Sequence, residues 1–363
     1  MTRGRRIALT VAVVLAVEAA LVLAGGAAVV WSGIVDVAAT VRHGPVARWF
    51  LHGVMRRSVA AHARGLSAPG FDDGMALRGA GHYRGGCAPC HGAPGERPSA
   101  VERNAEPTPP IYADFERWSP EELFWIVKHG VKLTAMPPWP EQGRDDEVWD
   151  MVSFLVLLPE MSPPQYRSMS DDSAATVPPL QALAGAPEAS RTCAACHGAD
   201  GRGRGGAFPR IAGLPKPYLA RALREFRDGT RASGMMERVA APLRDGDIAA
   251  IAAYFAAASN RPPGQPSSSD AEGERIARYG TTAGRFPPCQ ACHREPSRDG
   301  DIPDLGGQPE WYLRRQLALF RSGARAGTPE ARAMSSIASS LSESQSAAVS
   351  AYFAAPGGKS AAR

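Results

Sequence analysis

Cysteine and histidine recur in this sequence in one tight arrangement, Cys-x-x-Cys-His. It occurs at residues 87–91, 193–197 and 289–293, and the three copies use all six cysteines of the chain. Two thiols at this spacing can add to the vinyl groups of a porphyrin, while the following imidazole ligates the iron. The motifs therefore predict three covalently attached haem c groups. The predicted attachment residues are Cys87, Cys90, Cys193, Cys196, Cys289 and Cys292, and the predicted proximal iron ligands are His91, His197 and His293.

Other chemistries of a Cys-x-x-Cys pair fit the sequence less well. A thioredoxin-like redox pair belongs in a βαβ context, and the sequence has little strand pattern. A zinc ribbon needs a second cysteine pair within one compact unit, whereas the next pair here lies roughly a hundred residues away. Disulfides remain an alternative, but neither they nor the other two readings explain the histidine beside each pair.

The ligand on the other side of each iron decides between an electron carrier and a haem enzyme. A methionine thioether raises the reduction potential, whereas an open position binds small molecules. One methionine in each unit lies 39 to 45 residues after the haem histidine and just before the closing helix. These candidate ligands are Met136, Met236 and Met334. Gap filling in a core is the ordinary alternative for methionine, and it suits Met151 better, because that residue lies on a helical stripe.

A proximal imidazole also needs an acceptor for its second nitrogen. A loop that contains proline follows each motif, with Pro110 in PTPPIY, Pro209 in FPRIAG and Pro303 in IPDLGG. These loops are candidates for the acceptor, although an ordinary turn explains a proline there equally well. The runner-up distal ligands of the first haem are His82 and His129.

The amino terminus has the features of a membrane anchor. Arg3, Arg5 and Arg6 precede an apolar run over residues 7–31 that only Glu18 interrupts. The run is long enough to span a bilayer, and a basic flank stays in the cytoplasm. We therefore expect a single transmembrane helix in the cytoplasmic membrane, with the rest of the chain on the periplasmic side. A cleaved signal peptide is the alternative.

Two passages rich in Pro, Ser and Gly divide the remainder into three units. We expect a membrane anchor at 1–40 and a lead segment at 41–76, with linkers at 166–185 and 261–272. The haem domains are expected at residues 77–165, 186–260 and 273–358.

The second and third units repeat each other. YLARALREFRDGTR at 218–231 matches YLRRQLALFRSGAR at 312–325 with a constant offset of 94 residues. This is an internal duplication. Leu243 takes the place of Leu341 at the approach to the closing helix. Met334 stands seven residues before Leu341, and the residue seven before Leu243 is Met236 rather than Met235. Each unit also ends in a pattern of helical period, in the first through Val148, Met151, Val152 and Leu155.

Charge adds little to this prediction. The formal net charge is +5, which the propionates of three haems would offset. No basic run with interleaved aromatic residues is present, so we expect no binding to nucleic acid.

The three units together resemble class I cytochrome c domains. Residues 186–358 are similar to the tandem dihaem cytochromes c, in the repeated pattern of YL, FR and Met. Residues 77–160 are similar to membrane-anchored monohaem domains, in LFWIVKHGVKLTAMP. The resemblance implies an all-α fold, with three such domains in tandem behind one transmembrane helix. It also implies that the carbonyls of Pro110, Pro209 and Pro303 accept a hydrogen bond from the proximal histidines.

These features predict a membrane-anchored trihaem cytochrome that relays single electrons, with no independent catalysis. Expected partners are a quinol-oxidising complex or dehydrogenase as donor and a terminal oxidase or soluble carrier as acceptor. One alternative is a haem enzyme with an open iron, of the peroxidase or sulfur-compound dehydrogenase type. Another is the cytochrome subunit of a larger oxidoreductase.

Overall fold

The structure is a computed structural model. It describes residues 3–38, 40–170, 190–258, 271–280, 286–293 and 300–354. Within these ranges the regular elements are helices, and the only β pairing is an isolated bridge between Ala93 and Glu96. The all-α expectation is therefore confirmed. Most of the expected linkers, residues 171–185 and 261–270, lie outside the described part of the chain.

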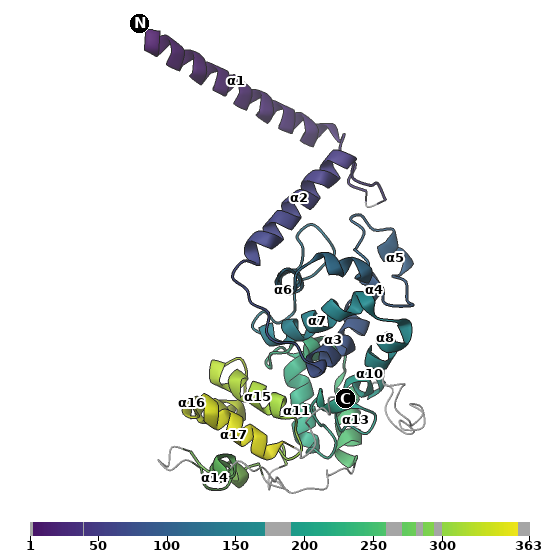
Figure 1. The fold of residues 1–363 in the computed structure, drawn as a ribbon, viewed down its shortest axis with the longest axis vertical. Coiled ribbons are helices and arrows are strands. Elements are labelled where there is room, and N and C mark those ends of the chain that lie inside the picture. Colours follow the sequence, from purple (N-terminus) through teal and green to yellow (C-terminus); the bar gives the residue numbers. More distant parts are fainter. Residues whose placement is uncertain are drawn as a thin grey trace.

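Two helices at the amino terminus project away from the rest of the molecule (Figure 1). Helix α1 spans Arg3–Ser32, and none of its residues is buried. It is long and apolar enough to cross a membrane, a property that it shares with signal sequences. Helix α2 spans Pro45–His62 and starts with proline in its first turn, where the missing N–H leaves no hydrogen bond unmade.

The first unit is built from six helices. They are α3 (Asp73–Gly86), α4 (Ala88–His91), α5 (Ala100–Arg103), α6 (Pro120–His129), α7 (Asp145–Leu157) and α8 (Pro163–Ser170). Short 3-10 turns at Tyr112–Arg117 and Leu158–Glu160 connect them. Helix α6 begins with a capping box between Ser119 and Glu122, which satisfies two backbone N–H groups at its start.

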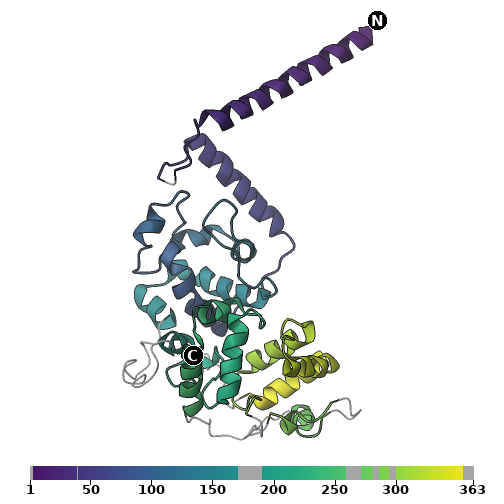
Figure 2. The same cartoon turned by 180° about the vertical axis from the view of Figure 1, so that it is seen from behind.

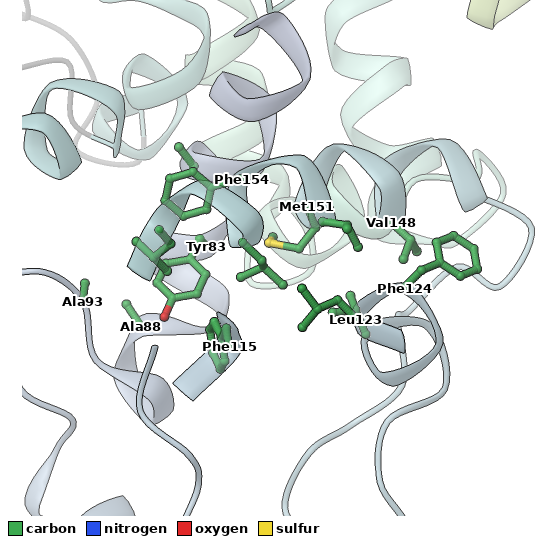
Figure 3. Close-up of a cluster of buried hydrophobic side chains, with 14 of the residues drawn as sticks. Tyr83, Ala88, Ala93, Phe115, Leu123, Phe124, Val148, Met151 and Phe154 are labelled. Carbon is green, nitrogen blue, oxygen red and sulfur yellow. The ribbon is translucent and has the colours of Figure 1, made fainter. Parts of the chain in front are cut away.

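Helix α7 supplies the centre of the first core. Val148, Met151, Val152 and Leu155 are all buried, as their helical spacing predicts. Figure 3 shows Met151 among the side chains of this cluster, with the ring of Tyr83 from α3 near Phe154. The two ring centroids are 5.3 Å apart. Met151 is thus a core residue, as expected.

The second and third units follow one plan, in keeping with their repeat. The second contains α10 (Ser190–His197), a 3-10 turn (Arg204–Gly206), α11 (Lys216–Arg227), α12 (Gly234–Ala240) and α13 (Asp245–Ala257). The third contains α14 (Ala271–Tyr279), a 3-10 turn (Cys289–Ala291), α15 (Glu310–Ser322), α16 (Pro329–Ser340) and α17 (Glu343–Phe353). In Figure 2 the green helices of the second unit lie beside the yellow helices of the third. Each of these units has its own buried core, one around Ile248 and Phe255 and the other around Ile276 and Phe353.

The short helices α12 and α16 were not expected. The sequence pattern predicts a middle helix and a closing helix in each unit, with the candidate methionine in the connection between them. In the structure Met236 and Met334 lie within helices of their own. Ser233 and Thr328 cap these helices by accepting hydrogen bonds from backbone N–H groups of the first turn.

Candidate haem sites

Each Cys-x-x-Cys-His motif lies on a helical turn. The first is on α4, the second ends α10, and the third begins on the 3-10 turn Cys289–Ala291. The backbone N–H of His91 donates to the carbonyl of Cys87 at 2.9 Å, and that of His293 donates to Cys289 at 2.9 Å. One helical turn therefore separates the first cysteine of the motif from the histidine.

The three histidines have the same hydrogen-bond acceptor. Nδ1 of His91 lies 2.7 Å from the carbonyl oxygen of Pro110. The corresponding distances are 2.9 Å from His197 to Pro209 and 2.9 Å from His293 to Pro303. A carbonyl can only accept, so Nδ1 carries the proton and Nε2 keeps a free lone pair.

Burial keeps these imidazoles neutral. It lowers the pKa of His91, His197 and His293, and the proline carbonyl acts in the opposite direction by favouring the protonated ring. A neutral imidazole whose Nδ1–H is held in place is the form that binds a metal through Nε2. The geometry is therefore that of a proximal ligand, and the ligand role itself stays a prediction.

The second and third motifs open onto one cavity of about 1290 Å³. Single ligand pockets typically occupy about 300 to 1,000 Å³, so this volume suits two large prosthetic groups better than one. From the two motifs and the methionine helices, the lining includes Cys193, Cys196, His197, Met236, Cys289, Cys292, His293 and Met334.

Two arginines at equivalent positions of the repeat also line this cavity. Arg231 is buried and donates to the hydroxyl of Tyr312 at 3.1 Å, and Arg325 donates to Gln316. Burial alone would raise the pKa of Tyr218, but the two arginines lower it to about 8. The cavity thus has a strongly positive region, which suits the acidic propionates of a haem.

The candidate methionines are placed differently in the three units. Met236 and Met334 line the shared cavity. Met235 lines the cavity as well and also packs against the core of the first unit, so the choice of Met236 as the ligand stays a prediction. Met136 is half-buried in the loop between α6 and α7, where its carbonyl accepts from the N–H of Val131 at 3.2 Å.

Of the runner-up histidines, His82 lies next to the first motif, since a Cβ atom on Gly86 would come within 3.2 Å of its Nε2. His82 lies against the ring of Trp139, with centroids 4.8 Å apart, and it lines the cavity of the second and third motifs. His129 packs beside Trp125 at 5.2 Å.

Two of the cysteines lack the lowered pKa of a reactive thiol. All six lie in the described ranges, and no disulfide joins any of them. Burial raises the pKa of Cys193 and of Cys289 to about 11, whereas reactive thiols have a lowered pKa. Across the described residues, no three His, Cys, Asp or Glu side chains gather in a way that could hold a metal ion.

Close contacts join the first unit to the other two, and the motifs do not predict them. A Cβ atom on Gly81 of α3 would come within 2.9 Å of the sulfur of Cys196. Asp150 of α7 pairs with Arg315 of α15 at 2.9 Å, and Glu147 of α7 contacts the start of α12. In the sequence, the acidic residues at the start of α7 are explained by their favourable interaction with the helix dipole. They therefore give no sign of contacts with another unit.

Two family models match separate parts of the chain. The model described as "Cytochrome C oxidase, cbb3-type, subunit III" matches residues 74–155, and the model described as "Cytochrome c" matches residues 183–259.

Curated relatives cover nearly half of the chain. A cytochrome c4 from Pseudomonas aeruginosa is 38% identical over 175 residues, which are 47% of this chain and 86% of the relative. A "thiosulfate dehydrogenase electron acceptor" from Thiomonas intermedia is 37% identical over 181 residues, 47% of this chain and 82% of the relative. The crystal structure of reduced cytochrome c4 from Pseudomonas stutzeri matches with a TM-score of 0.41 at 31% identity, over 45% of this chain and 93% of that one.

Proposed function

We propose that this chain, which belongs to the class I c-type cytochromes, binds three haems and relays single electrons along them outside the cytoplasmic membrane. Covalently bound haem c and electron transfer follow from the family itself. The proposal adds the number of haems, the membrane anchor and the periplasmic location.

The observation that carries the count of three is the repeated contact between histidine and proline. It supports a third haem because His293 and Pro303 repeat, at 2.9 Å, the arrangement of His197 and Pro209. The match to cytochrome c4 adds support, since its 175 residues exceed twice the length of the matched segment 183–259. We accordingly propose haem domains at 77–165, 186–260 and 273–358.

The residues of this chain would hold and tune the cofactors. When bound, each haem supplies an iron that takes up and releases one electron at a time. The cysteines fix the porphyrin, and the proline carbonyls orient the histidines. Methionines 136, 236 and 334 are proposed to bind the other side of each iron and so raise its potential. Arg231 and Arg325 would pair with propionates of the second and third haems.

Partner proteins are proposed by analogy with the relatives. The name of the Thiomonas relative supports a periplasmic dehydrogenase as donor. A terminal oxidase or soluble carrier would accept the electrons. The match of residues 74–155 to a cbb3-type oxidase subunit favours a second candidate, a cytochrome subunit built into a larger oxidoreductase. Purification under native conditions separates the two, because a subunit would copurify with its complex.

Haem content is the direct test of the proposed count. Acid–acetone extraction should leave the colour with the protein, since thioether bonds resist extraction. The mass of the intact protein should exceed that of the polypeptide by three haems, and a potentiometric titration should resolve three one-electron components. A mass increase of one or two haems in fully matured protein would contradict the proposal.

The anchor is tested by fractionation. Full-length protein should remain in the membrane fraction after a high-salt wash, because α1 is long and apolar enough to span the bilayer. A protein that begins at Val41 should be soluble and keep its haems. Sequencing of the mature amino terminus is the control: a start beyond residue 25 would identify α1 as a cleaved signal.

A further inference from the structure

One buried carboxylate contacts segments of two different units. Glu147 lies on α7 of the first unit and is only 3% exposed. Its Oε1 accepts from the hydroxyl of Ser233 at 2.6 Å, and its Oε2 accepts from the backbone N–H of Gly234 at 2.7 Å. Both partners belong to the second unit. Within its own unit, Glu147 Oε2 also accepts from the indole N–H of Trp139 at 3.3 Å.

These partners flank two of the proposed iron ligands. Trp139 follows Met136 by three residues in the same Pro-rich loop. Ser233 is the N-cap of α12, and its hydroxyl oxygen accepts from the backbone N–H of Met236 at 3.1 Å. Glu147 is therefore linked to the backbone of Met236 through a single hydroxyl.

The two methionine-bearing segments also touch each other. A Cβ atom on Gly234 would come within 2.2 Å of Trp139 Nε1, so any side chain at this position would displace the indole. Arg144 forms an ion pair with Glu147 at 2.9 Å and donates to the carbonyl of Ala232 at 2.5 Å. The start of α12 is thus held to the first unit by a carboxylate, a guanidinium and an indole.

We infer that Glu147 is a positioning residue shared by the loop of Met136 and the helix of Met236, so that one carboxylate couples the ligation of the first and second haems. This inference rests on the proposed function, which makes both methionines iron ligands. A buried carboxylate with several donors fixes their positions closely, because a buried donor left without an acceptor is costly.

The test compares Glu147→Gln with the full-length, haem-loaded wild type. The amide replaces one acceptor oxygen by an NH₂ group that faces donors. Each of the three methionine-ligated haems should contribute one third of the weak sulfur-to-iron charge-transfer band in the near infrared. In the variant the intensity of this band should fall by up to two thirds. Carbon monoxide should bind quickly at the affected haems of the reduced protein, and two of the three midpoint potentials should decrease. The third potential should stay at its wild-type value.

A matched control lies on the same helix. Asp145 is exposed and pairs with Lys128 of its own unit, so Asp145→Asn should leave the band and all three potentials unchanged. Ser233→Ala is the second variant, and it keeps the test valid if Glu147→Gln is poorly folded. It removes only the hydroxyl between Glu147 and Met236. It should therefore reduce the contribution of the second haem to the near-infrared band and leave the contributions of the other two unchanged.

Single ligand variants separate a failure of the inference from a failure of the proposed function. Met136→Ala and Met236→Ala should each lower the intensity of the band by one third. If they do so while Glu147→Gln and Ser233→Ala behave as wild type, the coupling through Glu147 is wrong and the ligands stand. If Met236→Ala leaves the band intact, the proposed ligand is wrong and the inference falls with it.

Discussion

Cys193→Ala should remove the second haem, perturb the third and leave the first intact. Cys193 is one of the two thiols that would attach the second porphyrin, and it lines the cavity that also contains Cys289, His293 and Met334. An unfilled half of this cavity would admit water beside the third haem, which exposes its iron and its propionates. The haem count should fall from three to two, and of the two remaining potentials only that of the third haem should shift.

Cys87→Ala is the matched comparison. The first motif belongs to a separate core, around Tyr83, Phe154 and Met151. Loss of the first haem should therefore leave the cavity of the other two filled. Equal shifts of the third potential in both variants would show that the shared cavity does not govern the third site.

The shared cavity, from which we expect the third site to depend on the second, could not be predicted from the sequence. The Pro-rich passages between the units indicate separate domains joined by linkers, and separate domains would lose their haems independently. Residues at equivalent positions of the repeat, such as Arg231 and Arg325, line this one cavity although 94 positions separate them. A repeat predicts that two units have similar folds, but it gives no information about how they pack against each other.

Local features were predictable to a greater extent. The cysteine motifs, the closing helices and the burial of Met151 depend on spacings within one or a few helical turns. The acceptor carbonyl of Pro110 is 19 residues from His91; the proline-containing loop made it one candidate, and the family resemblance favoured it over an ordinary turn. The contacts of Glu147 span 86 and 87 residues and rest on no motif. Its place in an acidic helix start conceals its role, because acidic residues are common there for electrostatic reasons alone.

Asp150→Ala should have the largest effect on stability. Asp150 is fully buried on α7 and accepts from Arg78 of α3 through two hydrogen bonds of 2.8 Å. It also accepts from Arg315 of α15 at 2.9 Å. The indole of Trp311 lies against both guanidiniums, 4.0 Å from that of Arg78 and 5.0 Å from that of Arg315. Asp150 therefore pairs with two arginines where the first and third units meet, and Asp146 is a second partner of Arg315 at 2.7 Å.

Removal of this carboxylate takes both hydrogen bonds from the buried guanidinium of Arg78 and leaves Arg315 with Asp146. Breaking a buried ion pair by deleting one partner costs about 3 to 5 kcal/mol, because the remaining charge is neither hydrated nor paired. The free energy of unfolding should fall by an amount in this range in denaturant titrations of the haem-loaded protein. Because the lost contact also holds α7 against α15, electron exchange between the first haem and the others should slow.

The exposed Asp145→Asn on the same helix provides the reference, since surface changes usually alter stability by less than about 0.5 kcal/mol. A second variant distinguishes charge from shape. Asp150→Asn keeps the volume and one acceptor oxygen, so a loss nearly as large as that of the alanine variant would identify charge neutralisation as the main contribution. If Asp150→Ala instead matched Asp145→Asn, Arg78 and Arg315 would have to be well hydrated, and the first unit would not be held to the third through this pair.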